Sequence, residues 1–358
     1  MDKIQVTSVL TDAIVQGLID GTLQRFGGVI QEVTTEKIVT CLRENEPLSM
    51  DWQNVESVLK LSSNASVLNL GLSVMGFAVI SQKLETIEQN LKQTQELFNK
   101  IDRKLDLSYY ANFRAALELA VNAFTMSKPE NRRSSALQAI NRFLEAEQHY
   151  LAFVDEDLAE SSQVVTEYLL SLALAYLAEV RCYLELEEFA TANRRFQVGS
   201  QLLRDRIKKY IELLLTENPA VYLHPQFKGE IDLSQLTQIY RWLDPVWNEN
   251  SVFELLREDL FVLAQNENKW FNSLPVAIWD NRFNWLSKNS QSKNTDPIPQ
   301  AMATMTSLIE TDRRFQAYQL EIGAIEELGI SFAEWLALTP QNPQQENSQL
   351  TYLILKET

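Results

Sequence analysis

The sequence is poor in glycine and proline, with 10 residues of each among 358. Globular proteins typically contain about 7% glycine and about 5% proline, so this chain has roughly half the usual supply of turn-forming residues. Folds made of many short strands and tight turns, and nucleotide folds built on glycine-rich loops, are therefore disfavoured. The composition predicts a mainly helical protein.

Cysteine and histidine are also scarce, at two residues each. Cys41 and Cys182 lie 141 positions apart, so we expect neither a disulfide framework nor a thiolate metal site. His149 follows Glu145 by four positions, whereas helices that bind di-iron centres place glutamate three positions before histidine, where Ala146 stands here. The sequence therefore predicts no metal and no cofactor.

Signatures of nucleophilic and phosphate-binding sites are missing. The sequence contains no Gly-x-Ser-x-Gly, no Gly-x-x-x-x-Gly-Lys-Ser/Thr and no Gly-x-Gly-x-x-Gly motif. Cys182 lies among apolar residues of a helical pattern, where a buried and inert thiol is expected. We predict that the protein is not an enzyme and has no catalytic residue. The alternative that the sequence leaves open is an enzyme that uses carboxylates alone.

Acidic residues outnumber basic ones, 48 to 32, which gives a net charge of -16. This field repels phosphate backbones, so we expect no nucleic-acid partner. Residues 194–209 depart from the average, because six basic residues accompany a single acidic one, Asp205. The stretch is a candidate site for an acidic partner or a phosphate, or else a solvated face that pairs with the protein's own acids. Its basic residues are Arg194, Arg195, Arg204, Arg206, Lys208 and Lys209.

The two ends of the chain carry the β-rich segments. An amphipathic helix is predicted over residues 1–24, followed by two β-branched runs at 28–33 and 37–42 that fit a hairpin. An isolated hairpin is marginally stable and needs a cover. The β-rich run 350–355 is expected to pair with this hairpin and to bring the two termini together.

A long uncharged segment runs from Leu61 to Gln82. Its central part is apolar on all sides, and from Phe77 to Leu105 apolar residues continue at spacings of three and four, as in a coiled-coil seam. We predict one long helix over 61–107 and a second over 301–338 that packs antiparallel to it. The candidate membrane or core residues are Val67, Leu68, Leu70, Gly71, Leu72, Val74, Met75, Gly76, Phe77, Val79 and Ile80.

The middle of the chain is predicted to form helical hairpins over 108–217 and an aromatic-rich helical lobe over 218–300. Within the hairpins, residues 183–199 resemble the second half of a tetratricopeptide repeat. Ala192, Phe196 and Gly199 occupy the small, aromatic and small positions of that pattern. The likeness covers at most one repeat and implies a tight helix-turn-helix.

The predicted fold class is all-α: an elongated helical bundle with two long antiparallel helices, helical hairpins and a small β element near the termini. The boundaries divide the chain into segments 1–60, 61–107, 108–217, 218–300, 301–338 and 339–358.

An apolar helix that continues into a coiled coil and pairs with a second long helix resembles the layout of α-helical pore-forming toxins of the cytolysin A type. The resemblance covers about 61–107 and 301–338 and includes no shared residue motif. It implies a hydrophobic element that is hidden in the soluble form and released on membranes. Residues 67–80 are fewer than the roughly 20 apolar residues that span a bilayer, so a buried core helix is the other interpretation.

We therefore expect a cytoplasmic, non-enzymatic scaffold or adaptor that binds protein partners through the hairpin surface around 160–215. The alternative is a membrane-active effector that releases segment 61–82 after a trigger such as partner binding or proteolysis. The first residues lack the basic and apolar regions of a secretory signal, which fits a cytoplasmic location. The sequence leaves open whether the protein is a monomer or an oligomer.

Overall fold

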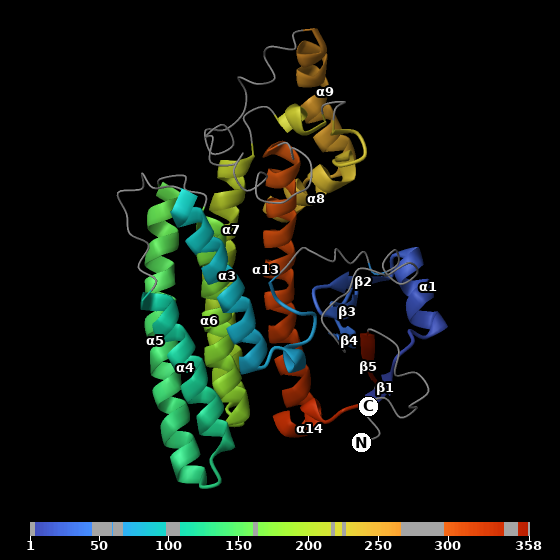
Figure 1. Ribbon diagram of the computed structural model, residues 1–358. Coiled ribbons are helices and arrows are strands. Elements are labelled where there is room, and N and C mark those ends of the chain that lie inside the picture. Colours follow the sequence, from blue (N-terminus) through green and yellow to red (C-terminus); the bar gives the residue numbers. More distant parts are fainter. Residues whose placement is uncertain are drawn as a thin grey trace. The chain divides into compact units, whose positions relative to one another are not determined.

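The computed structural model describes residues 4–44, 59, 67–97, 108–159, 164–215, 219–223, 227–265, 297–339 and 350–356. The chain divides into two compact units. Unit 1 contains residues 1–151, 170–203 and 311–358, and unit 2 contains residues 152–169 and 204–310. The described residues are mostly helical, with a five-stranded antiparallel sheet near the termini (Figure 1), which confirms the prediction of a helical protein with a small β element.

The sheet lies in unit 1 and has the strand order β1-β5-β4-β3-β2. Strand β3 (Val29–Glu32) pairs antiparallel with β4 (Ile38–Glu44), which confirms the predicted hairpin. Strand β5 (Leu350–Leu355) pairs antiparallel with β4, as the β-rich tail predicts. Strand β1 (Ile4–Thr7) pairs with β5, so both ends of the chain meet in one sheet (Figure 1).

The helix predicted over residues 1–24 is confirmed only over Asp12–Asp20 and is wrong in its extent across the described residues 4–24. These residues form β1, the short helix α1 (Asp12–Asp20) and strand β2 (Leu23–Phe26). Helix α1 ends at Gly21, whose φ of 78° lies in the left-handed region that favours glycine. The pairing of β1 with β5 and of β2 with β3 overrides the amphipathic pattern, because strand formation depends on partners elsewhere in the chain.

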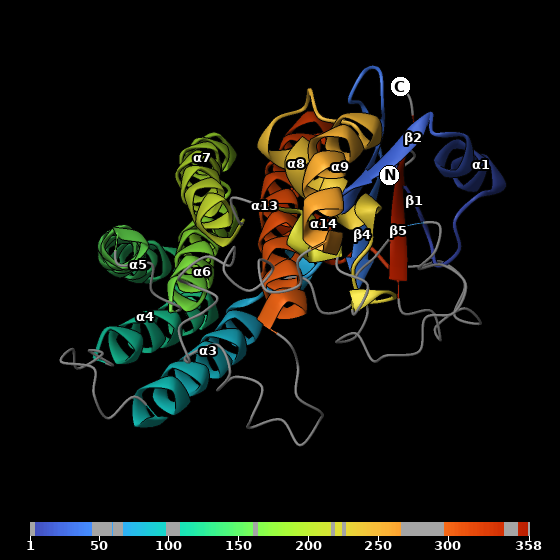
Figure 2. The same ribbon diagram turned by 90° about the horizontal axis from the view of Figure 1, so that it is seen from above.

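Both faces of the sheet are covered within unit 1. On one face, Ile14 of α1 joins a buried cluster that includes Ile30, Leu42 and Tyr352. Successive residues of a strand point to opposite faces, so Arg43 points away from this cluster and donates a hydrogen bond to the carbonyl oxygen of Trp335 at 3.0 Å. Figure 2 shows α1 on one side of the sheet and helix α14 (Phe332–Leu336) on the other.

The single helix predicted over 61–107 is wrong in its first part. Residues 67–76, called the strap below, form irregular chain with bends and a short 3₁₀ turn at Leu72–Val74, and helix α3 (Phe77–Leu97) starts after them. Leu68, Leu70, Gly71 and Leu72 are all buried. The remaining parts of this prediction, 61–66 and 98–107, lie outside the described residues.

Close backbone approach holds the strap out of a helix. A Cβ atom on Gly28 would lie 1.7 Å from the carbonyl oxygen of Leu70, and one on Gly71 would lie 2.8 Å from the carbonyl oxygen of Leu42. Only glycine allows the strap and the sheet to come this close. The sheet therefore fixes the path of the strap.

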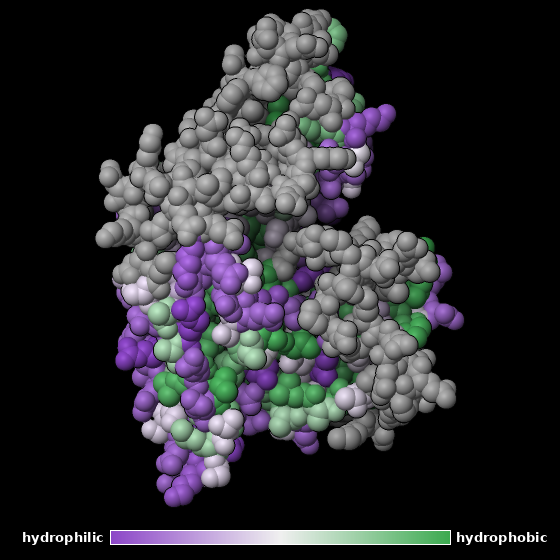
Figure 3. Space-filling view, in the orientation of Figure 1, coloured by the Kyte–Doolittle hydropathy of each residue, from purple (hydrophilic) through white to green (hydrophobic). Residues whose placement is uncertain are grey.

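Helix α3 has the amphipathic character that the seam spacing predicts. Ile80, Leu84, Ile87 and Leu91 are buried. Its exposed positions carry hydrophilic residues, which appear as a purple band along α3 in Figure 3. The amphipathic spacing is therefore confirmed for the described side chains of α3, residues 77–92.

The described part of the predicted hairpin region, 108–217, contains four helices: α4 (Ser108–Thr125), α5 (Pro129–Ala159), α6 (Val165–Glu185) and α7 (Phe189–Leu214). Within unit 1, a Cβ atom on Gly199 of α7 would lie 2.6 Å from the ring of Tyr176 of α6. The small residue therefore permits the close helix-turn-helix packing expected for 183–199.

The second long helix, predicted over 301–338, is wrong at its end. Helix α13 (Pro297–Leu328) stops at Gly329, whose φ is 66°, and α14 starts after a capping box formed by Ser331 and Glu334. Asp312, which interrupts the apolar seam in the sequence, is fully buried and accepts hydrogen bonds from Gln316 at 2.9 Å. Asp312 therefore does not face solvent, although it is an acidic residue.

Unit 2 contains the described part of the aromatic-rich lobe. A 3₁₀ segment (Pro219–Leu223) precedes α8 (Leu233–Leu243) and α9 (Glu249–Gln265), which agree with the short helices expected there. Trp242 is buried, and Tyr240 lies 5.3 Å from Trp247 between ring centroids. Aromatic residues between 266 and 296 lie outside the described residues.

Candidate functional site

The strap is buried in unit 1. Leu68, Leu70, Leu72 and Met75 are each at most 1% exposed, and Ile80 of α3 is 0% exposed. The other candidate membrane or core residues range from buried to half-buried: Gly71 and Phe77 are buried, and Val67, Val74, Gly76 and Val79 are half-buried. The chain itself therefore covers the apolar segment, as the core interpretation predicts.

Side chains from α13 and α6 bind the backbone of the strap. Arg314 donates to the carbonyl oxygen of Leu68 at 2.5 Å, and Tyr318 donates to that of Asn69 at 2.5 Å. The Leu72 N–H donates to the Glu321 carboxylate at 2.8 Å, and Arg181 donates to the Leu72 carbonyl oxygen at 3.4 Å. These four side chains, called the clamp residues below, bind backbone groups of the buried strap. The Leu72 carbonyl oxygen also accepts from the Met75 N–H at 3.1 Å within the 3₁₀ turn.

Glu321 is the centre of this arrangement. Its carboxylate also accepts a hydrogen bond from the Trp335 indole N–H at 2.8 Å and lies close to the charges of Arg43 and Arg181. Burial raises the pKa of Glu321, while the two hydrogen bonds and the two arginines oppose that shift. Burial lowers the pKa of Arg43 and of Arg181. Glu321 therefore joins the strap backbone to a buried group of charges that includes Arg43 and Arg181.

Composition and motif searches miss the clamp residues because they lie far from the strap in sequence. The strap itself has a signal, since leucines at 68, 70 and 72 alternate with asparagine, glycine and serine. This period of two differs from the spacing of an amphipathic helix and is the sequence signal against an α-helix here.

The predicted basic stretch is distributed over both units. In unit 1, Arg194 is exposed, whereas Arg195 binds Glu179 at 2.7 Å and Glu147 at 2.6 Å. Both glutamates are 0% exposed. Burial and the adjacent Glu179 carboxyl raise the pKa of Glu147, and the neighbouring Arg195 opposes that shift. Arg195 therefore neutralises buried acid within its own unit.

In unit 2, two of the four basic residues contact the chain itself. Arg204 lies over the Trp242 ring at 4.7 Å, and Arg206 forms an ion pair with Asp155 at 2.7 Å. Lys208 and Lys209 are exposed. Arg195 and Arg206 therefore pair with the protein's own acids, as the alternative to a partner site predicts, but their side chains are largely covered rather than solvated.

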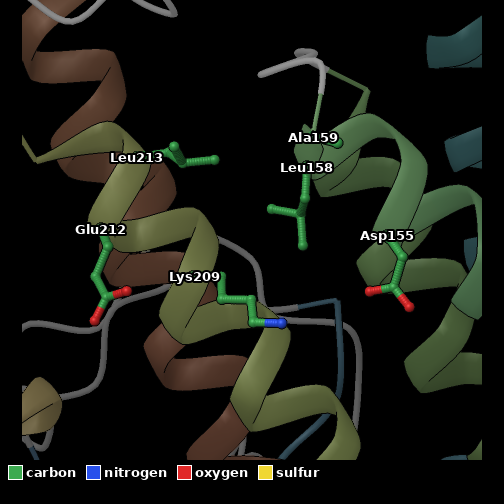
Figure 4. A pocket seen from close by; sticks show the side chains of 6 residues that line it. All are labelled: Asp155, Leu158, Ala159, Lys209, Glu212 and Leu213. Atoms are coloured by element: carbon green, nitrogen blue, oxygen red, sulfur yellow. The ribbon is translucent and has the colours of Figure 1, made fainter.

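A groove lies between the C-terminal ends of α5 and α7 in unit 2. Its cavity has a volume of about 440 Å³. Leu158 and Leu213 point toward each other across it from the two helices, and the Lys209 ammonium group points into the space between them (Figure 4). The lining residues, called the groove residues below, are Asp155, Leu158, Ala159, Lys209, Glu212 and Leu213.

The described thiols and the described histidine show no arrangement for catalysis. Cys41 and Cys182 are buried, and burial raises the pKa of both thiols. His149 packs its ring against Tyr109, with 4.3 Å between ring centroids. Within the described ranges, no group of three histidine, cysteine or acidic residues could hold a metal ion.

No protein-family model matches this chain, and no curated protein and no solved structure match it either. Across the parts of the chain that the structure describes, no helix combines the length and the apolar character needed to cross a membrane.

Proposed function

We propose that the protein is a non-enzymatic helical scaffold or adaptor that binds a protein partner at the groove residues. The observation that carries this proposal is the groove itself, in which apolar side chains of two helices face each other and charged side chains form the rim. Such a combination of apolar walls and a few polar groups is typical of binding sites. The groove adjoins the hairpin surface around 160–215, which the sequence favours for this role.

The scaffold that we propose is an elongated bundle in which the long helices α3 and α13 run antiparallel. Its apolar segment stays covered in the resting protein. The burial of the strap supports this part of the proposal, because it leaves the groove as the candidate contact surface.

Site-specific photocrosslinking in the host cells tests the proposal. A photoreactive residue at Leu213 should form a discrete adduct with a partner, whereas one at Val121 of α4, which is similarly exposed (42% against 36%), should not. Ala159→Arg should abolish the Leu213 adduct by filling the groove from an exposed position, and Ala152→Arg on the same helix serves as the matched control. Equal adducts at both positions, or an adduct that survives Ala159→Arg, would refute the proposal.

A membrane-active role is the second proposal. It is favoured by one observation: an uncharged apolar segment is covered by the chain's own side chains and lacks α-helical structure over residues 67–76. Release of that segment would require the hydrogen bonds between the clamp residues and its backbone to break.

Dye release from phosphatidylcholine vesicles, with the intact chain and with the chain after limited proteolysis, tests the membrane role. Leakage that Gly76→Asp abolishes and Ala115→Asp on α4 leaves unchanged is the expected result. Retention of the dye in every case contradicts the membrane role.

A further inference from the structure

The groove of unit 2 is lined by one basic residue, Lys209, and by two acidic residues, Asp155 and Glu212. Arg206 engages Asp155 through an ion pair of 2.7 Å, and Glu212 points away from the cavity (Figure 4). The Lys209 ammonium group points into the space between α5 and α7, and no described residue forms an ion pair with it. A bound group at this position therefore meets a cation.

The walls beside Lys209 are aliphatic. Leu158 is 8% exposed and Leu213 is 36% exposed, and the two side chains approach the cavity from opposite helices. A volume of about 440 Å³ lies within the usual range of ligand sites, about 300–1,000 Å³. The site therefore combines an apolar slot with one cation at its edge.

We propose that the groove binds a protein segment in which an aliphatic side chain stands next to a carboxylate. The aliphatic side chain lies between Leu158 and Leu213, and the carboxylate pairs with Lys209. This inference rests on the proposed function, and it narrows the partner to an acidic and aliphatic motif. It also selects Lys209 from the six basic residues of the 194–209 stretch.

Three acetylated and amidated peptides test the inference: Ser-Glu-Leu-Glu-Ser, its glutamine counterpart and its lysine counterpart. Binding is followed through the methyl signals of Leu158 and Leu213 in the full chain. The acidic peptide should shift both signals and bind about threefold to fivefold more tightly than the glutamine peptide, which is the scale of one exposed ion pair. The net charge of -16 attracts the lysine peptide, so a preference for the acidic one must arise locally.

Two variants separate the groove lysine from general electrostatics. Lys209→Gln should remove the preference for the acidic peptide, while Lys208→Gln, an exposed neighbour outside the lining, should retain it. Equal binding of the acidic and glutamine peptides, a preference that persists in Lys209→Gln, or methyl signals that do not move at millimolar acidic peptide each overturn the inference. A Leu213 crosslink that still forms in that case leaves the proposed function standing, whereas loss of the crosslink refutes the function itself.

Discussion

The Glu321→Gln substitution tests the hydrogen bonds of the Glu321 carboxylate with almost no change in the shape of the side chain. The two oxygens of Glu321 accept from the Leu72 N–H and from the Trp335 indole N–H, each at 2.8 Å, at a site that is 2% exposed. In glutamine one oxygen becomes an NH₂ group, so one of these two donors loses its acceptor. A buried donor without a partner costs about 1–3 kcal/mol.

The second hydrogen bond also weakens, because bonds to a charged acceptor are roughly twice as strong as neutral ones. Arg43 and Arg181 lose a nearby opposite charge, whereas relief from burying the carboxylate offsets part of the loss. The net expectation is that the variant destabilises unit 1 by about 3 kcal/mol. At 1.4 kcal/mol per factor of ten, the Leu72 amide should exchange about a hundredfold faster.

Hydrogen exchange followed by mass spectrometry measures this effect, together with the urea midpoint of unfolding. Glu327→Gln, at an exposed position of the same helix, is the matched control and should change stability by less than about 0.5 kcal/mol. If Glu321→Gln exchanges and unfolds like the wild type, the reasoning about the clamp residues is refuted.

Three further predictions concern other parts of the molecule. Arg195→Met should destabilise unit 1 by about 3–5 kcal/mol because it leaves Glu147 and Glu179 without their cation. Arg142→Met, which removes an exposed ion pair with Glu145, should cost at most about 1 kcal/mol. Urea unfolding measures both losses of stability, and similar losses would contradict the account. Burial raises the pKa of Glu167 from 4.5 to about 7, so the folded state binds this proton more tightly than the unfolded state does. The free energy of unfolding should therefore fall by about 3 kcal/mol as the pH rises from 4.5 to about 7. Glu167→Gln should remove this slope and raise the melting temperature at pH 8, and an unchanged slope would show that Glu167 does not cause it. Gly28→Ala should lower the melting temperature because its Cβ atom would lie 1.7 Å from the Leu70 carbonyl oxygen. Gly323→Ala, where α13 leaves open space for a Cβ atom, should raise the melting temperature. Equal shifts would contradict the close approach of Gly28 to the strap.

Local patterns predict the elements that carry their own information. The hairpin of β3 and β4, the tail strand and the hairpin helices follow from β-branched runs and from amphipathic spacing over short ranges. The seam from Ile80 to Leu91 predicts the buried side of α3 for the same reason. These features need no partner from a distant part of the chain to be recognised.

The strap could not be placed from apolar content alone. A run of leucine, valine and methionine fits a buried helix and a buried extended chain equally well, and the choice depends on Gly28 and the clamp residues, which lie far away in sequence. The buried polar residues of α13 pose the same difficulty, since Asp312 and Glu321 read as solvent-facing until their neighbours are known. The groove is formed by two helix ends that are more than 50 positions apart in sequence. The charge pattern of the sequence therefore identifies only Lys209 among its lining residues.

The most direct measurement of the central claim is amide hydrogen exchange of the strap in the intact wild-type protein. The account predicts slow exchange at Leu72, whose N–H is bound to Glu321 inside unit 1, and at Ile80, whose N–H is bound to the Gly76 carbonyl oxygen at the start of α3. Exchange of residues 67–76 at the rate of an unfolded peptide would contradict it, because the apolar segment would then be open to water.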